Sequence, residues 1–168
     1  MNAHLVIRQL VRSLHALDRI LSKAEEHATA KSFDVNVLAT ARLAPDMFPL
    51  TRQIGSACDA AKFAAAYTSG QTPPPHPDTE TTVAELHARI AAVLGWLEGL
   101  GEDAFAGSAD RKVTPKWLKS GWIAADDYLL QVAVPNFYFH VTTAYDILRH
   151  NGVPVGKADF LSQPTIRS

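Results

Sequence analysis

The stretch PNFYFHVTTAYDILRHNGVPVGKADFL, residues Pro135–Leu161, decides the fold class. Together with the residues just before it, its first half carries the spacing of three and four residues that is typical of one buried helix face, at Leu130, Ala133, Phe137, Ala144 and Ile147. His140 occupies a position of this apolar series, and Asn151-Gly152 with Pro154 marks a sharp helix end. A titratable side chain on a buried face is either a packed polar residue or part of a site.

Three further segments show helical periodicity. They run from Asn2 or Ala3 to about Lys31, from about Asp46 to Ser69, and from about Thr79 to Gly101. Asp46 is expected to cap the second segment, with Pro49 in its first turn. Thr82-x-x-Glu85 predicts a capping box in the third. We expect the fourth helix to begin near Asp126 or Asp127 and to kink or divide near Val134, because Pro135 lies inside its pattern.

Two segments lack helical periodicity. The sequence GQTPPPHPD, Gly70 to Asp78, predicts a stiff crossover between helices. In the excursion 102–125, residues 111–114 and 121–123 are expected to pair as a small hairpin, and Trp117 and Trp122 indicate that it covers the end of the bundle. The sequence therefore predicts one all-α domain over 1–168, a four-helix bundle with a short hairpin or irregular excursion between helices three and four.

Composition excludes several classes of function. The net charge of −1 offers no basic surplus for nucleic acid. Neither a signal peptide nor a long apolar run occurs, so we expect a cytoplasmic protein and no membrane partner. The single cysteine, Cys58, excludes disulfide frameworks and multi-cysteine metal sites, and its alanine-rich surroundings predict a small buried residue.

The candidate site residues are His140, Asn136 and Asp46. Asn136 lies one helical turn before His140, so both side chains can share a face, and Asp46 has the phase to add a carboxylate. One interpretation of His140 is a packed, hydrogen-bonded neutral imidazole. The other is a metal ligand or proton-transfer group. The remaining histidines form no H-x-x-x-H pair, and we expect His76, in the proline-rich connector, to be solvated.

Three motifs resemble the bacterial domain-of-unknown-function-1993 family. They are LAPDMFPLTRQ (43–53), ACDAAKFAAA (57–66) and NFYFHVTTAYDILRHNGVPVGKADFL (136–161). That family is grouped with the DinB-like, or YfiT-like, metalloenzyme superfamily of four-helix bundles. The resemblance covers nearly the whole chain and implies an up-down-down-up bundle that is often a homodimer.

The resemblance also locates a site. Metal-binding DinB-like proteins hold a divalent ion with one histidine from the second helix and two from an H-x-x-x-H in the fourth, shortly before an L-R-x-x-G stretch. Residues 148–152, LRHNG, match that stretch, which places His140 on the second histidine of the pair and Asn136 on the first. The second helix contains no histidine. One ligand of three therefore remains, and we expect no bound cofactor, with zinc, nickel or iron at His140 as the alternative.

Two functions follow from these observations. The favoured hypothesis is a dimeric, non-enzymatic bundle whose ancestral site has decayed. The alternative is a small-molecule enzyme or binder, for example a thiol-dependent transferase, with His140 as base or sole imidazole ligand, Asn136 as an orienting group and Asp46 as a carboxylate partner.

Overall fold

A computed structural model describes residues 1–162 and is mostly helical. The long helices are α1 (Ala3–Lys31), α2 (Leu50–Ser69), α3 (Val83–Glu98) and α5 (Val134–His150). The shorter elements are η1 (Val35–Leu38), η2 (Glu102–Phe105), η3 (Ser108–Asp110), β1 (Lys112–Val113), β2 (Ile123–Ala124), α4 (Ala125–Tyr128), the π-helical segment η4 (Leu129–Ala133) and α6 (Lys157–Leu161). No described helix combines the length and the hydrophobicity needed to span a bilayer.

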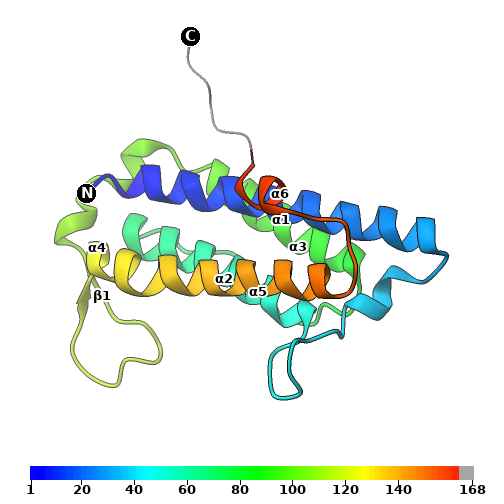
Figure 1. Cartoon of the computed structure of the whole chain (residues 1–168). Helices are drawn as coiled ribbons and strands as arrows, with labels where there is room; N and C mark the ends of the chain where they lie inside the picture. The colour runs from blue at the N-terminus through cyan, green and yellow to red at the C-terminus, as the bar shows by residue number, and fades with distance from the viewer. Residues whose placement is uncertain (163–168) are drawn as a thin grey trace, which may run out of the picture.

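The four long helices form an up-down-down-up bundle (Figure 1). At one end, the backbone N–H of Val83 donates to the side chain of Asn36, so α3 begins beside η1, where α2 also begins. At the other end, the side chain of Asn2 donates to Glu102, so α3 ends beside the start of α1. Helices α2 and α3 are consequently parallel, and the proline-rich segment between them crosses the length of the bundle. The predicted fold is confirmed.

Two predicted helix starts are confirmed by their capping contacts. The Asn2 side chain accepts from the backbone N–H of Leu5 at the start of α1. Thr82 and Glu85 form the reciprocal capping box of α3, in which each side chain accepts a backbone N–H at the other residue. Four donors of Thr81 and Thr82 stabilise the charged carboxylate and lower the pKa of Glu85 to about 2.

The start of α2 differs from the prediction. Asp46 lies exposed in the preceding turn and caps nothing, because the helix begins at Leu50 with Pro49 as its N-cap. Phe48 precedes a proline, and the proline ring disfavours the helical conformation for the residue before it. The helix therefore cannot extend back to Asp46.

The fourth helix divides where Pro135 predicts, although it continues without a break in direction. Helix α4 passes into η4, and α5 follows from Val134. Because Pro135 has no N–H to donate within the helix, a wider π turn before it removes the conflict with the preceding carbonyl groups. A final helix that the sequence did not predict, α6, packs back on α1, where Lys23 Nζ lies 2.6 Å from Asp159.

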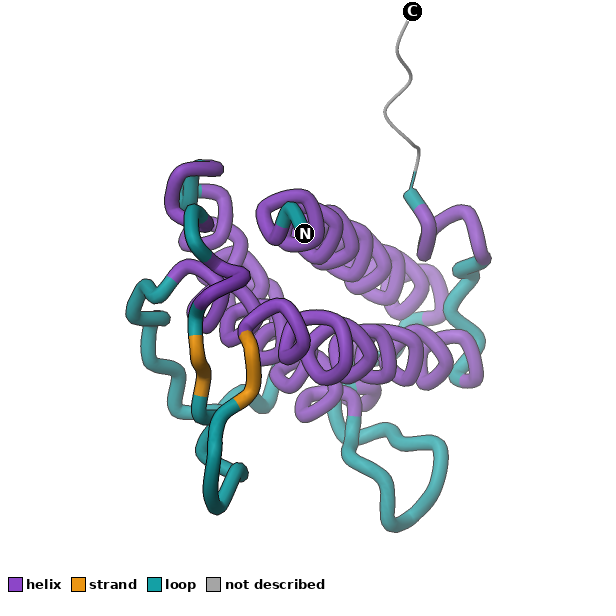
Figure 2. Tube along the Cα trace, turned by 90° about the vertical axis from the view of Figure 1, so that its left-hand side faces the viewer, coloured by secondary structure: helices purple, strands orange, loops and turns teal. Residues whose placement is uncertain are grey.

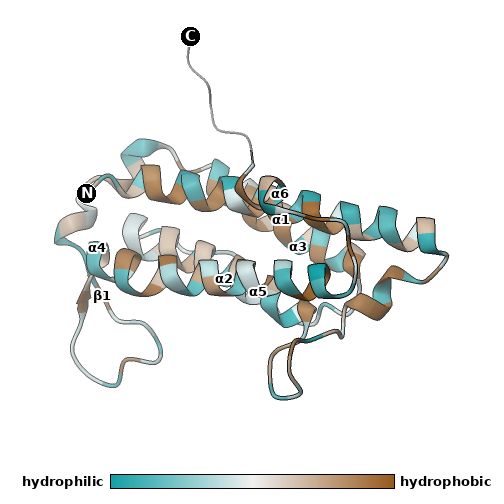
Figure 3. Ribbon diagram, viewed as in Figure 1, coloured by the Kyte–Doolittle hydropathy of each residue, from teal (hydrophilic) through white to brown (hydrophobic). Residues whose placement is uncertain are grey.

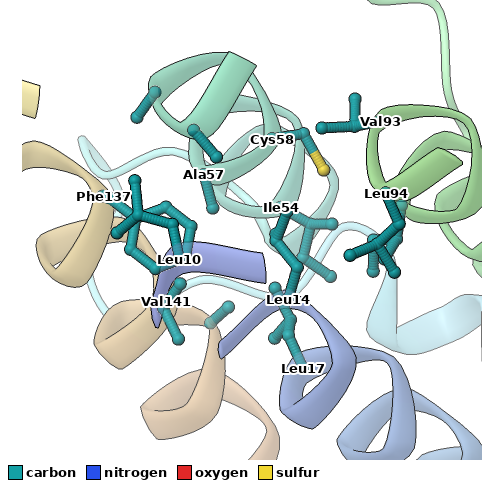
Figure 4. Close-up of a cluster of buried hydrophobic side chains, with 14 of the residues drawn as sticks. Leu10, Leu14, Leu17, Ile54, Ala57, Cys58, Val93, Leu94, Phe137 and Val141 are labelled. Atoms are coloured by element: carbon teal, nitrogen blue, oxygen red, sulfur yellow. The ribbon is translucent and has the colours of Figure 1, made fainter. Parts of the chain in front are cut away.

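The core lies between the four long helices and contains mostly aliphatic side chains (Figure 4). Figure 3 shows hydrophobic and hydrophilic residues alternating along the ribbon of α1. Helix α2 is the most buried, and its alanines, among them Ala57, Ala61 and Ala64, are fully enclosed. These small residues let α5 and α3 approach α2 closely.

The excursion between α3 and α5 contains the expected hairpin. Strands β1 and β2 pair antiparallel, with Lys112 opposite Ala124 and Val113 opposite Ile123. Figure 2 shows that the loop between them projects away from the bundle. The excursion lies at the end of the bundle as expected, where Phe105 and Val113 join the core. Trp117 and Trp122 are both more than half exposed, so these two rings do not contribute to that contact.

Candidate functional site

His140 lies on the buried face of α5, and only 8% of its surface is exposed. Its Nδ1 atom lies 2.7 Å from Oε1 of Gln53 in the first turn of α2. Gln53 is 1% exposed, and its amide nitrogen donates to the backbone carbonyl of Phe48 at 3.2 Å. A chain of two hydrogen bonds thus joins α5, α2 and the segment that precedes α2.

These two hydrogen bonds determine the protonation of the imidazole. The Phe48 carbonyl accepts only, so the amide nitrogen of Gln53 must face it and Oε1 must face His140. An amide oxygen also accepts only, so Nδ1 of His140 carries the hydrogen. In the neutral ring, Nε2 then holds a lone pair. This Nε2 has no hydrogen-bond partner among residues 1–162 and is not fully buried.

Burial lowers the pKa of His140 below its ordinary value, because the protonated ring loses hydration that no carboxylate replaces. The nearest ring is that of Phe139, whose edge packs on the imidazole at a centroid distance of 5.2 Å. Phe139 itself is 58% exposed. The site is therefore a neutral histidine at the edge of an apolar surface.

Asn136 and Asp46 do not join His140 in a shared contact. Asn136 is exposed one turn away on α5, because a step of four residues exceeds a full helical turn and places it at the margin of the buried face. Asp46 is exposed in the turn before α2. The structure thus places Asn136 and His140 on one side of α5, but no hydrogen bond links either Asn136 or Asp46 to the imidazole.

Gln53 is the site residue that the sequence reasoning missed. It lies three residues after Leu50 and four before Ala57, which are both fully buried. The available signal was a polar residue at the spacing of the buried apolar residues of α2. The same signal identified His140 on α5.

The residues around His140 do not fit the divalent metal that the DinB-like superfamily implies. Transition-metal sites take three or more imidazole, thiolate or carboxylate ligands. Here the ring offers Nε2 alone, and its partner is an amide, which is a weak ligand for such ions. Among the described residues no group of three or more His, Cys, Asp or Glu side chains could hold a metal.

A second polar cluster lies on the far side of α2, outside the predicted site. The guanidinium of Arg89 on α3 is buried and contacts three carboxylates, Asp59 at 2.6 Å, Asp78 at 3.1 Å and Glu80 at 3.2 Å. Asp78 and Glu80 belong to the connector, here the whole segment 70–82 between α2 and α3 that includes the proline-rich stretch. Arg89 therefore holds the connector against α2 and α3.

Lys62 and His76 extend this cluster. Lys62 Nζ lies 2.7 Å from Asp59 and donates to Nδ1 of His76 at 3.1 Å. Burial and the neighbouring cations Arg89 and Lys62 lower the pKa of His76, so the expectation that His76 is simply solvated is wrong. Cys58 is fully buried beside the cluster, and burial raises the pKa of its thiol to about 12, which agrees with a packing role.

Comparisons with known proteins agree with the fold. The family model described as "Domain of unknown function (DUF1993)" matches residues 4–161. The crystal structure of a DinB family member protein from Shewanella denitrificans is similar, with 43% sequence identity and a TM-score of 0.93, over 99% of this chain and 94% of that one. No match was found among curated proteins.

Proposed function

Because this chain belongs to the DUF1993 family and has the DinB-like fold, we propose that it is a homodimeric, non-enzymatic bundle with a decayed metal site. The resemblance places His140 on a ligand position of the superfamily, and Gln53 contacts His140 from α2. In this chain the pair ties α5 to α2 and contributes to the fold.

The observation that carries the proposal is the hydrogen bond between His140 Nδ1 and Gln53 Oε1. A histidine ligand in a metal site commonly donates its other ring N–H to an oxygen, so this contact alone resembles a ligand's support. Gln53, however, offers His140 only an amide oxygen, and α2 contains no histidine that could act as a second ligand. One imidazole without further ligands does not retain a divalent ion against water.

The outer surface of α5 supports the homodimer. Phe139 on α5 and Leu130 on the preceding segment η4 are both more than half exposed. Exposed aromatic side chains such as Phe139 are enriched at contacts between subunits. The alanines of α2 do not contribute to a dimer interface, because they are buried in contacts within the chain.

The alternative function is favoured by one specific feature, the lone pair of His140 Nε2. Gln53 orients the ring so that Nε2 is the unprotonated nitrogen, which suits a base or an acceptor for a small ligand. A thiol-dependent transferase would use it to take the proton of a bound thiol. Nitrogen NMR of the imidazole during titration with reduced glutathione tests this alternative, which requires a shift of the Nε2 resonance that is absent in Gln53→Leu.

Elemental mass spectrometry of the purified protein tests the main proposal. We expect no stoichiometric zinc, nickel or iron, and unchanged metal content in His140→Ala.

A further inference from the structure

We propose that the hairpin arm, residues 112–124, is a peripheral docking element for bilayers that contain anionic phospholipid. The arm consists of β1, β2 and the loop between them, and it projects from the end of the bundle next to α4 (Figures 1 and 2). The proposal concerns contact with the membrane surface by a folded domain.

The arm is anchored at its base and ordered at its tip. Val113 is buried, and the backbone N–H of Ala125 donates to the carbonyl of Arg111 at 2.9 Å. Within the loop, Pro115 is buried and its carbonyl accepts from the N–H of Leu118 at 2.9 Å. The tip is therefore a defined turn on a fixed base.

The loop of the arm exposes two large aromatic side chains. Trp117 is 57% exposed and Trp122 is 55% exposed, although tryptophan is among the residues that gain most from burial. The chain has three tryptophans, so two of them lie in one nine-residue loop. Packing inside the bundle does not account for this placement, and indole rings favour the interface between lipid headgroups and acyl chains.

The arm is also cationic. Lys112, Lys116 and Lys119 belong to the arm, and residues 112–124 contain no aspartate or glutamate. None of the three lysines forms an ion pair within residues 1–162, and Lys112 Nζ lies 4.4 Å from the ring centroid of Trp122. Lysines around aromatic side chains are typical of segments that rest on anionic bilayers, where each cation adds attraction to the surface potential.

The surrounding charges favour a flat surface over other anionic partners. Acidic residues flank the base of the arm, with Asp110 just before β1 and Asp126 and Asp127 just after β2. A nucleic acid strand that ran along the base would meet these carboxylates, whereas a planar bilayer would contact the projecting arm. A second copy that paired arm to arm would bring its lysines against like charges.

The test is co-sedimentation of the full chain with vesicles. We expect binding to phosphatidylcholine vesicles that contain phosphatidylserine and no binding to phosphatidylcholine alone. Trp117→Ala/Trp122→Ala and Lys116→Glu/Lys119→Glu should each weaken binding by at least about tenfold. Leu5→Ala and Lys157→Glu, which alter exposed residues away from the arm, should bind as the unchanged protein does.

Circular dichroism controls for folding, since every altered residue is exposed. The proposal is overturned if the unchanged protein does not bind the anionic vesicles, or if both arm variants bind as well as it does. It is also overturned if the arm variants instead abolish a dimer, or lose binding to single-stranded nucleic acid, while vesicle binding is unaffected.

Discussion

Oε1 of Gln53 lies 2.7 Å from Nδ1 of His140, and both side chains are buried between α2 and α5. This hydrogen bond fixes the imidazole tautomer and satisfies two polar groups that would otherwise be costly to bury. The contribution of each of these two residues to the free energy of unfolding therefore depends on the presence of the other.

Gln53→Leu should therefore lower the free energy of unfolding by about 1–3 kcal/mol, because it leaves the Nδ1–H of His140 buried without a partner. In the double variant with His140→Leu, the loss should be smaller than the sum of the two single losses, since no orphaned donor remains. Urea unfolding of the four proteins measures this coupling. Gln131→Leu, at an exposed glutamine, should change stability by less than about 0.5 kcal/mol. Additive losses would show that the pair is not coupled.

Acid should destabilise the protein through His140. Burial lowers the pKa of the folded imidazole below the ordinary 6.5, so below that pH the unfolded chain binds a proton that the folded chain excludes. Stability then falls as the pH drops through 6.5 towards the folded pKa. His140→Gln should show a shallower decline, measured by urea unfolding across this range. His76→Gln should remove a contribution of the same sign, because the pKa of His76 is also lowered. A slope unchanged by both variants would contradict this linkage.

Loss of the Arg89 ion pairs should affect both the stability of the protein and the proteolysis of the connector. Arg89 is 1% exposed and contacts Asp59 and two carboxylates of the connector. Arg89→Met should cost about 3 kcal/mol, because it leaves partly buried carboxylates without their cation. The connector, residues 70–82, should also become a site of rapid proteolysis. Arg52→Ala serves as the control, since its half-exposed ion pair with Asp78 is expected to contribute less than about 1 kcal/mol. Equal losses in the two variants would argue against a connector clamp.

The homodimer is tested at Phe139. Light scattering after gel filtration should give a dimer for the unchanged protein and a monomer for Phe139→Asp, because a charge in an apolar interface remains unpaired. Leu5→Asp, which places the same charge at an exposed leucine of α1, should stay dimeric. If the unchanged protein is a monomer, the proposed homodimer is contradicted.

Helix periodicity was sufficient to predict the bundle, because burial of one apolar face gives each long helix a repeating sequence signal. The capping box at Thr82 and Glu85 and the division of the fourth helix near Val134 were also predictable. Each depends only on residues that are close neighbours in sequence. Asp46 misled the prediction of the α2 start, where the restriction that Pro49 imposes on Phe48 outweighs the preference of aspartate for caps.

The site was only half predictable. His140 interrupts an apolar series and is visible from sequence, whereas its partner lies 87 positions away and is known only once α2 and α5 are packed. The Arg89 cluster has the same origin, because it joins α2, α3 and the connector. Long-range polar pairs carry no local periodicity, so a single sequence does not show them.

Metal content of the purified protein tests the central claim most directly. Elemental mass spectrometry should find less than stoichiometric zinc, nickel and iron in the unchanged protein and in His140→Ala. As a positive control, Gln53→His/Asn136→His gives α2 and α5 the three-imidazole pattern of the superfamily, and it should gain zinc that the further change His140→Ala removes. Near-stoichiometric metal in the unchanged protein, lost in His140→Ala, would contradict the account and identify His140 as a ligand.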